Sequence, residues 1–192
     1  EPVMTVMRML RLSVIAALIA VLAAGGLVAS SPTPVQAAPK VSVSGTAQAD
    51  GASELKLSGS GFQSIQGGFG GIYVLFGWVD DPSGGWRPSA GGMTGESYQY
   101  QYDDETNPEG FQLFVAFPGS STSAAANGGE VAADGTWSGS MKLQGARFDT
   151  FDRQQNRTTL DCTEVQCGII TIGAHGVKNA DNESFTPVDF EG

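Results

Sequence analysis

Apolar and polar residues alternate along several short stretches of this chain, which is the pattern of strands that bury one face. Other stretches are almost continuously apolar, which favours strands that are covered on both faces. No stretch shows a long helical period. The eight predicted strands cover residues 41–44, 54–60, 72–76, 97–102, 111–117, 135–143, 168–172 and 185–190.

Turn residues separate these strands. Asp50-Gly51, Asn107-Pro108 and Asp134-Gly135 are typical turn signals between apolar runs. The best helical candidate, Ala124–Ala126, is too short and lies in a segment rich in Gly, Ser and Ala. Short strands joined by such turns predict an all-β chain, either a β-sandwich or a barrel.

The first residues have the order of parts of a secretory signal. Arg8 and Arg11 precede an apolar run over 12–29, and Val35-Gln36-Ala37 offers small residues for cleavage after Ala37. We therefore expect a signal peptide over 1–37 and one domain over 38–192. The alternative is an uncleaved anchor, since the run approaches the ~20 residues that span a bilayer. After cleavage no membrane span is expected.

Charge and composition narrow the classes of function. The 192 residues carry 10 basic and 20 acidic side chains, and removal of Arg8, Arg11 and Glu1 leaves 8 and 19, a net charge of −11. This balance argues against nucleic acid as a partner, because phosphate contacts need clustered Lys and Arg. A single histidine, His175, excludes sites that need two imidazoles.

The two cysteines, Cys162 and Cys167, are separated by four residues. In a secreted chain they would meet oxidising conditions and form a structural disulfide across a tight turn. The alternatives are a redox pair, which is usually Cys-x-x-Cys, or a metal site, which would need further ligands. We expect the disulfide, and no metal site.

Motifs in the same region resemble the neocarzinostatin-like family of small secreted actinobacterial proteins. Asp161-Cys162-Thr163 with Cys167 is similar to the family's Asp-Cys-Thr-x-x-x-Cys segment, and Gly77-Trp78-Val79-Asp80 lies where the family has Trp-Val-Asp. The resemblance implies an immunoglobulin-like antiparallel β-sandwich of seven to nine strands with one disulfide. It also implies a secreted or cell-surface location.

The chain departs from the antibiotic-carrying members in two ways. Their second disulfide has no counterpart near Gly77 and Arg87, and an inserted segment lies near 98–129. Gly59-Ser60-Gly61-Phe62 resembles instead a broader set of actinobacterial surface domains, which often accompany haem-uptake domains. That resemblance makes haem a possible cofactor, with no other cofactor expected.

Five residues are candidates for contact with a ligand or partner. Trp86 lies in a glycine-rich loop, which predicts an exposed ring at a contact surface. Tyr98, Tyr100 and Tyr102 would form a stripe on one strand face, able to stack on a planar ligand or a sugar, or else to cover the sheet. His175 would be either a haem ligand or a loop histidine bonded to backbone.

Catalysis is not expected. There is no Gly-x-Ser-x-Gly elbow, and the carboxylates of Asp149 and Asp152 have no context that would raise one pKa. Asp103-Asp104-Glu105 with Glu109 could collect calcium, but a solvated acidic turn is the expected structure.

These observations predict a non-catalytic binding or interaction module, secreted or associated with the cell envelope. Its partner would be an envelope component or a protein, contacted through the Trp86 loop and the tyrosine stripe. The alternative is a carrier of a small hydrophobic ligand, such as haem or a chromophore, in a cleft between one sheet and the inserted segment.

Overall fold

The computed structural model describes residues 35–192. The predicted signal peptide lies almost entirely outside these residues, so its cleavage stays a prediction. Among the described residues, no helix has the length and apolar character needed to cross a membrane.

The described residues form twelve strands and four short 3-10 helices, and they contain no α-helix. Each of the eight predicted strands overlaps an observed one, but the total exceeds the seven to nine expected. The strands are β1 (Lys40–Ser44), β2 (Ala47–Gln48), β3 (Ser53–Ser60), β4 (Gly71–Val79), β5 (Tyr98–Tyr100), β6 (Leu113–Ala116), β7 (Trp137–Leu143), β8 (Arg147–Phe151), β9 (Arg157–Asp161), β10 (Cys167–Gly173), β11 (Ser184–Pro187) and β12 (Phe190–Glu191). The 3-10 helices are η1 (Pro88–Ala90), η2 (Ser123–Ala125), η3 (Ala174–Gly176) and η4 (Ala180–Asn182).

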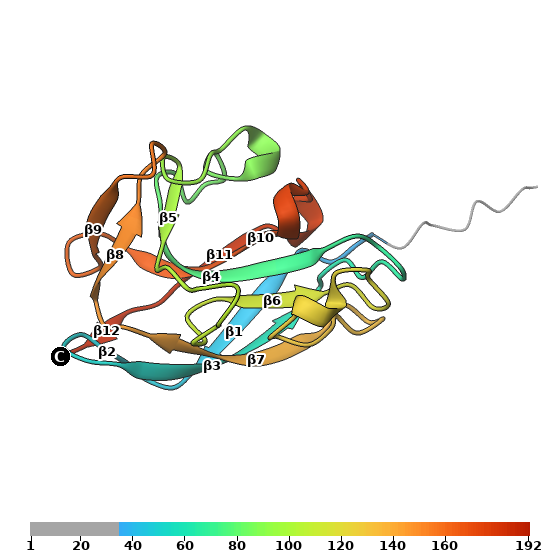
Figure 1. Ribbon diagram of the computed structural model, residues 1–192, viewed down its shortest axis with the longest axis horizontal. Coiled ribbons are helices and arrows are strands. Elements are labelled where there is room, and N and C mark those ends of the chain that lie inside the picture. Colours follow the sequence, from blue (N-terminus) through green and yellow to red (C-terminus); the bar gives the residue numbers. More distant parts are fainter. Residues whose placement is uncertain (1–34) are drawn as a thin grey trace, which may run out of the picture. The chain divides into compact units, whose positions relative to one another are not determined.

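Two antiparallel sheets form the sandwich (Figure 1). One sheet has the order β1-β3-β7, and the other has the order β11-β10-β4-β5, with β6 also pairing with β4. This is the immunoglobulin-like arrangement, in which the first, second and fifth strands face the third, sixth and seventh. The fold class expected from the sequence is therefore confirmed.

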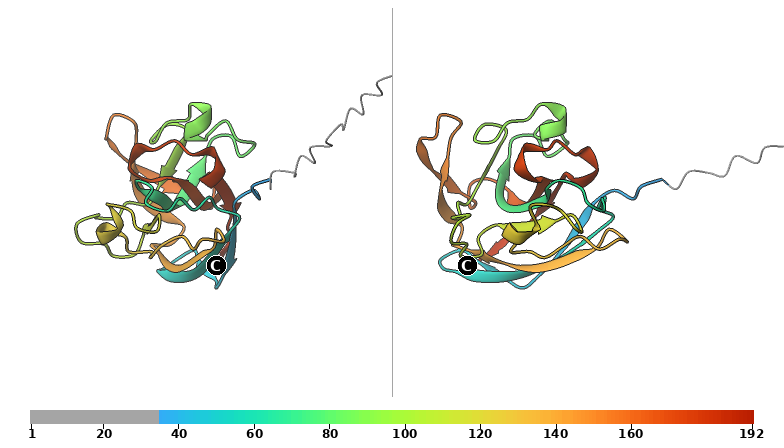
Figure 2. Two further views of the ribbon diagram at one scale, coloured as in Figure 1. Left: turned by 90° about the vertical axis from the view of Figure 1, so that its right-hand side faces the viewer. Right: turned by 45° about the vertical axis from the view of Figure 1, so that its right-hand side comes forward.

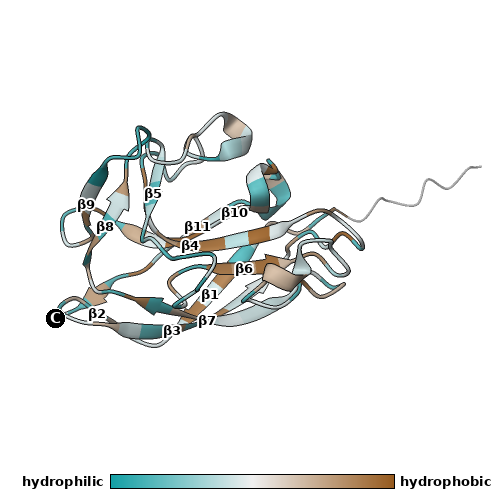
Figure 3. Ribbon diagram, viewed as in Figure 1, coloured by the Kyte–Doolittle hydropathy of each residue, from teal (hydrophilic) through white to brown (hydrophobic). Residues whose placement is uncertain are grey.

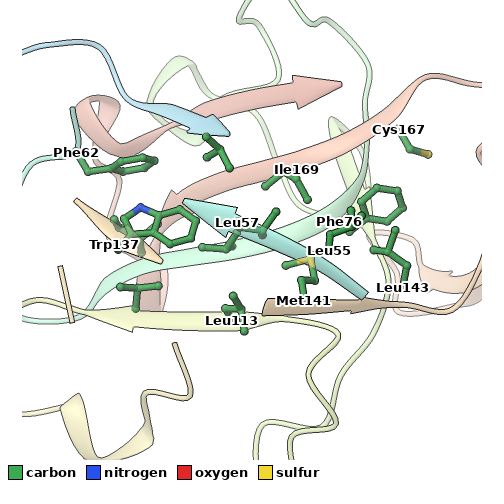
Figure 4. Close-up of a cluster of buried hydrophobic side chains, with 14 of the residues drawn as sticks. Leu55, Leu57, Phe62, Phe76, Leu113, Trp137, Met141, Leu143, Cys167 and Ile169 are labelled. Atoms are coloured by element: carbon green, nitrogen blue, oxygen red, sulfur yellow. The ribbon is translucent and has the colours of Figure 1, made fainter. Parts of the chain in front are cut away.

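The core lies between the two sheets and consists mainly of inward residues from strands of both sheets (Figure 4). On β4, Ile72, Val74 and Phe76 point inward, and they meet Leu55 and Leu57 of β3 in the same cluster. Burial of such side chains stabilises the fold by about 1.5–3 kcal/mol each. β4 is apolar along much of its length because its other face is covered as well (Figure 3).

A second apolar cluster covers the outer face of the β4–β10 sheet. Trp86 is 0% exposed and packs with Leu75 and Ile170, and its ring lies 5.9 Å from that of Tyr98 in an edge-to-face contact. The loop that carries Trp86 is tied down by Glu183, whose buried carboxylate accepts the Ser89 backbone N–H at 2.9 Å. The expectation of an exposed Trp86 ring was wrong, because the outer sheet face is apolar and needs a cover.

β5 and β6 are two parts of one edge strand along β4. Tyr100 pairs with Gly77 and Leu113 pairs with Val74, whereas a continuous strand would bring residue 103 opposite Val74. The chain therefore inserts ten residues (113 − 103), which we call the inserted loop, residues 102–111. Extra residues in an edge strand leave the ladder and bend away from it, often beside a functional site.

The β8–β9 hairpin extends away from the two sheets (Figure 2) and was not predicted. Its strands alternate weakly, because charged pairs such as Arg147 with Asp161 lie across from each other in place of apolar residues. The expected disulfide joins Cys162, just after β9, to Cys167 at the start of β10. It closes the return from the hairpin to the core.

Candidate functional site

A pocket of about 210 Å³ opens on the outer face of the five-stranded sheet. It lies at the end of this face that Trp86 leaves uncovered. Tyr73 of β4 and Phe114 of β6 are among its apolar lining residues, and His175 of η3 borders it. Its other walls come from the inserted loop and from Ala125 of η2. The pocket lies between one sheet and the segment 98–129, the place where the carrier hypothesis puts its cleft.

Three aromatic rings meet in this pocket, each nearly perpendicular to the other two. Ring centroids lie 5.6 Å apart for Tyr73 and Phe114, 5.4 Å for Tyr73 and His175, and 4.8 Å for Phe114 and His175. The interplanar angles are 70°, 70° and 80°. Edge-to-face contacts of this kind are favourable and fix the rings relative to one another.

His175 is held in an unusual backbone conformation. Its φ of 55° places it in the left-handed region, which is uncommon for residues other than glycine. Its Nδ1 lies 2.9 Å from the Tyr73 hydroxyl. Burial, and next the charge of Glu105, raises the pKa of Tyr73, so this hydroxyl keeps its proton and can donate it to Nδ1. Strained residues held by their surroundings often mark functional sites.

The inserted loop is built around the carboxylate of Asp103. Its two oxygens accept five backbone N–H groups, from Asp104 and from residues 109–112, at 2.8–3.1 Å. The residue is 6% exposed. Asp103 is therefore buried, which corrects the expectation of a solvated turn, while Asp104, Glu105 and Glu109 are exposed as expected.

Two glutamines close the neck of the inserted loop. The fully buried Gln101 donates from Nε2 to the carbonyls of Phe111 and Lys142, at 3.0 and 2.7 Å, and accepts from the Gln144 N–H. Gln112 donates back to the Gln101 carbonyl at 2.8 Å. Because these polar groups are paired, the loop has a fixed base although it lies outside the strand ladder.

The rim of the pocket is acidic. Asp104 Oδ1 accepts both the N–H and the hydroxyl of Thr106, at 2.8 and 2.7 Å. These bonds, the side-chain one first, lower the pKa of Asp104, so its carboxylate stays charged at neutral pH. Glu105 lies beside it, and none of the residues from 35–192 that line this pocket is a lysine or an arginine.

The three tyrosines of the predicted stripe do not form one contact surface. Tyr98 is buried with Trp86, and this burial, followed by the neighbouring Tyr100, raises its pKa to about 12. Tyr100 stacks on Tyr98 with a centroid distance of 6.2 Å. Tyr102 is 55% exposed and meets Phe151 of the β8–β9 hairpin instead. Tyr98 therefore covers the sheet, which removes it as a contact residue.

A second pocket, of about 300 Å³, lies between β5 and the β8–β9 hairpin. Tyr100, Tyr102 and Phe151 line it, together with polar groups such as Gln99 and Asp152. The five predicted site residues are thus divided. His175 borders the first pocket, Tyr100 and Tyr102 line the second, and Trp86 and Tyr98 belong to the interior.

Sequence reasoning missed Tyr73, Phe114 and Asp103 as pocket residues. Tyr73 and Phe114 stand in apolar runs that predict buried strands. The signal was the period of two within those runs, which turns both rings to the face opposite Ile72 and Val115. Nothing local distinguishes Asp103 from its exposed neighbours.

The described residues offer few ways to hold a metal or haem. No group of three His, Cys, Asp or Glu side chains among residues 35–192 is placed to bind a metal ion. The first pocket, at about 210 Å³, falls below the roughly 300–1,000 Å³ typical of sites for drug-sized ligands. The haem macrocycle is too large for it, so His175 is not placed as a haem ligand here.

Comparison with known proteins finds no family model and no curated protein that matches this chain. Among solved structures, macromomycin matches with a TM-score of 0.42 and 15% sequence identity, over 78% of this chain and 100% of that one. A similarity of this degree assigns neither a family nor a ligand. The resemblance to the neocarzinostatin-like family therefore rests on the sequence motifs, and the immunoglobulin-like fold rests on the strand order.

Proposed function

We propose that this is a secreted or envelope-associated, non-catalytic binding protein that holds a small ligand in the pocket formed by Tyr73, Phe114 and His175. The observation that carries the proposal is the meeting of three fixed aromatic rings on a sheet face that is otherwise covered. Apolar pockets with a few convergent polar groups are the usual binding sites of folded proteins.

The construction of the pocket supports this function. The inserted loop is held by the buried carboxylate of Asp103 and closed by Gln101, yet it contributes nothing to the core between the sheets. A loop that is ordered by its own polar contacts, and that walls a pocket without entering the core, is typical of a ligand site on a rigid scaffold. The Cys162–Cys167 disulfide supports an extracellular location.

The pocket can be tested by closing it. Ala125 lines the pocket and is exposed, so Ala125→Phe would fill it without removing any core contact. Its neighbour Ala124 is also exposed but does not line the pocket, which makes Ala124→Phe the matched control. The probes are choline, 3,3-dimethylbutan-1-ol, phenol and indole. Their binding is measured through amide chemical shifts in NMR titrations.

We expect at least one probe to shift the amides around Tyr73, Phe114 and His175, and Ala125→Phe to abolish these shifts while Ala124→Phe keeps them. If no probe perturbs this region, or if Ala125→Phe binds as the unaltered protein does, the pocket is not the binding site.

A second candidate is contact with an envelope component or protein partner through the second pocket. It is favoured by the exposed Tyr102 and Phe151, which are 55% and 37% exposed and lie in edge-to-face contact at 5.6 Å. Loss of envelope association in Tyr102→Ala, with ligand binding in the first pocket intact, would favour this candidate.

A further inference from the structure

The charge of the first pocket limits the ligands that it can take. The carboxylates of Asp104 and Glu105 stand at its rim, and the part of the chain that the structure describes places no lysine or arginine in its lining. The carboxylate of Asp103 already accepts hydrogen bonds from backbone N–H groups. The rim carboxylates of Asp104 and Glu105 are therefore the ones that can interact with a ligand. Such a site repels carboxylates and phosphates and attracts positive charge.

The aromatic rings act in the same direction. Tyr73 and Phe114 both line the pocket, and a cation near the face of such a ring is attracted by the negative charge of that face. The field of Glu105 reaches this point, because its charge contributes to raising the pKa of the Tyr73 hydroxyl. The aromatic walls and the carboxylates therefore both favour a positively charged ligand.

A metal ion does not fit these features. The described residues hold no group of three His, Cys, Asp or Glu side chains that could bind one, and the surface of the pocket is mostly apolar. An organic cation suits it better, since alkyl groups on nitrogen contact the rings while the charge stays near the carboxylates. The volume of about 210 Å³ admits a small cation and excludes a drug-sized one.

We propose that this pocket binds a small organic ammonium ion that carries alkyl groups on its nitrogen and no phosphate. The cation would be held between the rings of Tyr73 and Phe114 and the carboxylates of Asp104 and Glu105. This inference rests on the proposed binding function and names its ligand chemistry. Phosphorylated head groups are disfavoured by the same rim acids.

The test compares choline with 3,3-dimethylbutan-1-ol, which has the same shape but no charge. Calorimetric titration of the full chain measures both affinities. We expect choline to bind about tenfold more tightly than the neutral alcohol, the size of effect that a cation–π contact and nearby carboxylates provide. Added salt should weaken the binding of choline and leave that of the alcohol unchanged.

Two charge-removing variants separate the local effect from the net charge of the protein. Glu105→Gln removes a rim carboxylate, and Glu109→Gln removes another exposed carboxylate of the same loop, one that does not line the pocket. Glu105→Gln should weaken choline binding about threefold, and Glu109→Gln should leave it nearly unchanged.

The outcomes distinguish the two proposals. If the neutral alcohol binds as tightly as choline, or if Glu105→Gln and Glu109→Gln behave alike, the cation inference is overturned while the pocket remains a binding site. If choline and the alcohol both fail to bind, the cation inference is also overturned. The proposed function then depends on the phenol and indole titrations.

Discussion

The Tyr73 hydroxyl and Nδ1 of His175 lie 2.9 Å apart, although the two residues are 102 positions apart in the chain. This bond orients the imidazole, and it joins β4 to η3, which directly follows β10. Tyr73→Phe removes the bond but keeps the ring. We expect it to lower the free energy of unfolding by about 0.5–1.5 kcal/mol, the usual value of one hydrogen bond.

Choline affinity should change less than about twofold in Tyr73→Phe, whereas Tyr73→Leu, which lacks the ring, should lose about tenfold. Calorimetric titration checks both variants against the unaltered protein. Equal losses in the two variants would mean that the hydroxyl, and not the ring, contacts the ligand.

Asp103 holds the inserted loop, so its carboxylate should matter far more than that of its neighbour. Asp103→Asn leaves one oxygen for five backbone N–H groups and puts an amide donor among them. We expect a loss of about 2–3 kcal/mol in the free energy of unfolding, together with loss of probe binding. Asp104→Asn is the control, measured in the same urea titrations, and should change the unfolding midpoint little.

Replacement of Trp86 tests whether its ring is buried, as in the structure, or exposed, as the sequence predicted. As a fully buried residue it should cost about 3–5 kcal/mol of stability when replaced by Ala. Met93→Ala, in the same loop at 37% exposed, should cost little. A thermal midpoint of Trp86→Ala equal to that of the unaltered protein would restore Trp86 as a surface residue.

Gly59 lies opposite Trp137 in the β3–β7 ladder, and the indole lies directly over it. A Cβ at Gly59 would come within 2.0 Å of the Trp137 ring nitrogen, so Gly59→Ala forces the ring out of the core. We expect a loss of about 1–3 kcal/mol. Gly51→Ala is the matched control, since a Cβ there meets nothing within 4 Å. Similar unfolding midpoints for the two variants would contradict this placement of Trp137.

Acid should destabilise the protein through aspartates whose side chains hold its turns. In each of these turns a side-chain hydrogen bond is the main cause that lowers the pKa of an aspartate below its ordinary 3.8. Because the folded pKa lies below the unfolded one, the contribution is complete above pH 3.8 and is lost as the pH falls through the folded values. The aspartates are Asp81, Asp104, Asp134, Asp152 and Asp161.

Urea unfolding at pH 6 and pH 3 measures this effect, and the midpoint should fall at pH 3. Combined Asp→Asn changes at positions 134 and 161 should reduce the difference between the two pH values. An unchanged difference would show that other carboxylates control the acid sensitivity.

Local patterns predicted much of this fold. The alternation at 54–60 and 135–143 became the β3 and β7 strands because one face of each is buried. The predicted turn at Asp134-Gly135 is present, because the Asp134 carboxylate accepts the N–H and the hydroxyl of Thr136. The Cys162–Cys167 disulfide was predictable because it closes a short loop and needs no distant partner.

The sequence by itself determined the all-β class, the turns and the disulfide, since each depends on residues that are close along the chain. Only the tertiary structure decided which apolar rings are exposed and which are covered. Trp86 is interior because a distant sheet face needs a cover, and Tyr73, Asp103, Phe114 and His175 form a pocket because four separate segments meet there. Such contacts depend on how strands far apart in sequence pair, and local period and composition do not encode that pairing.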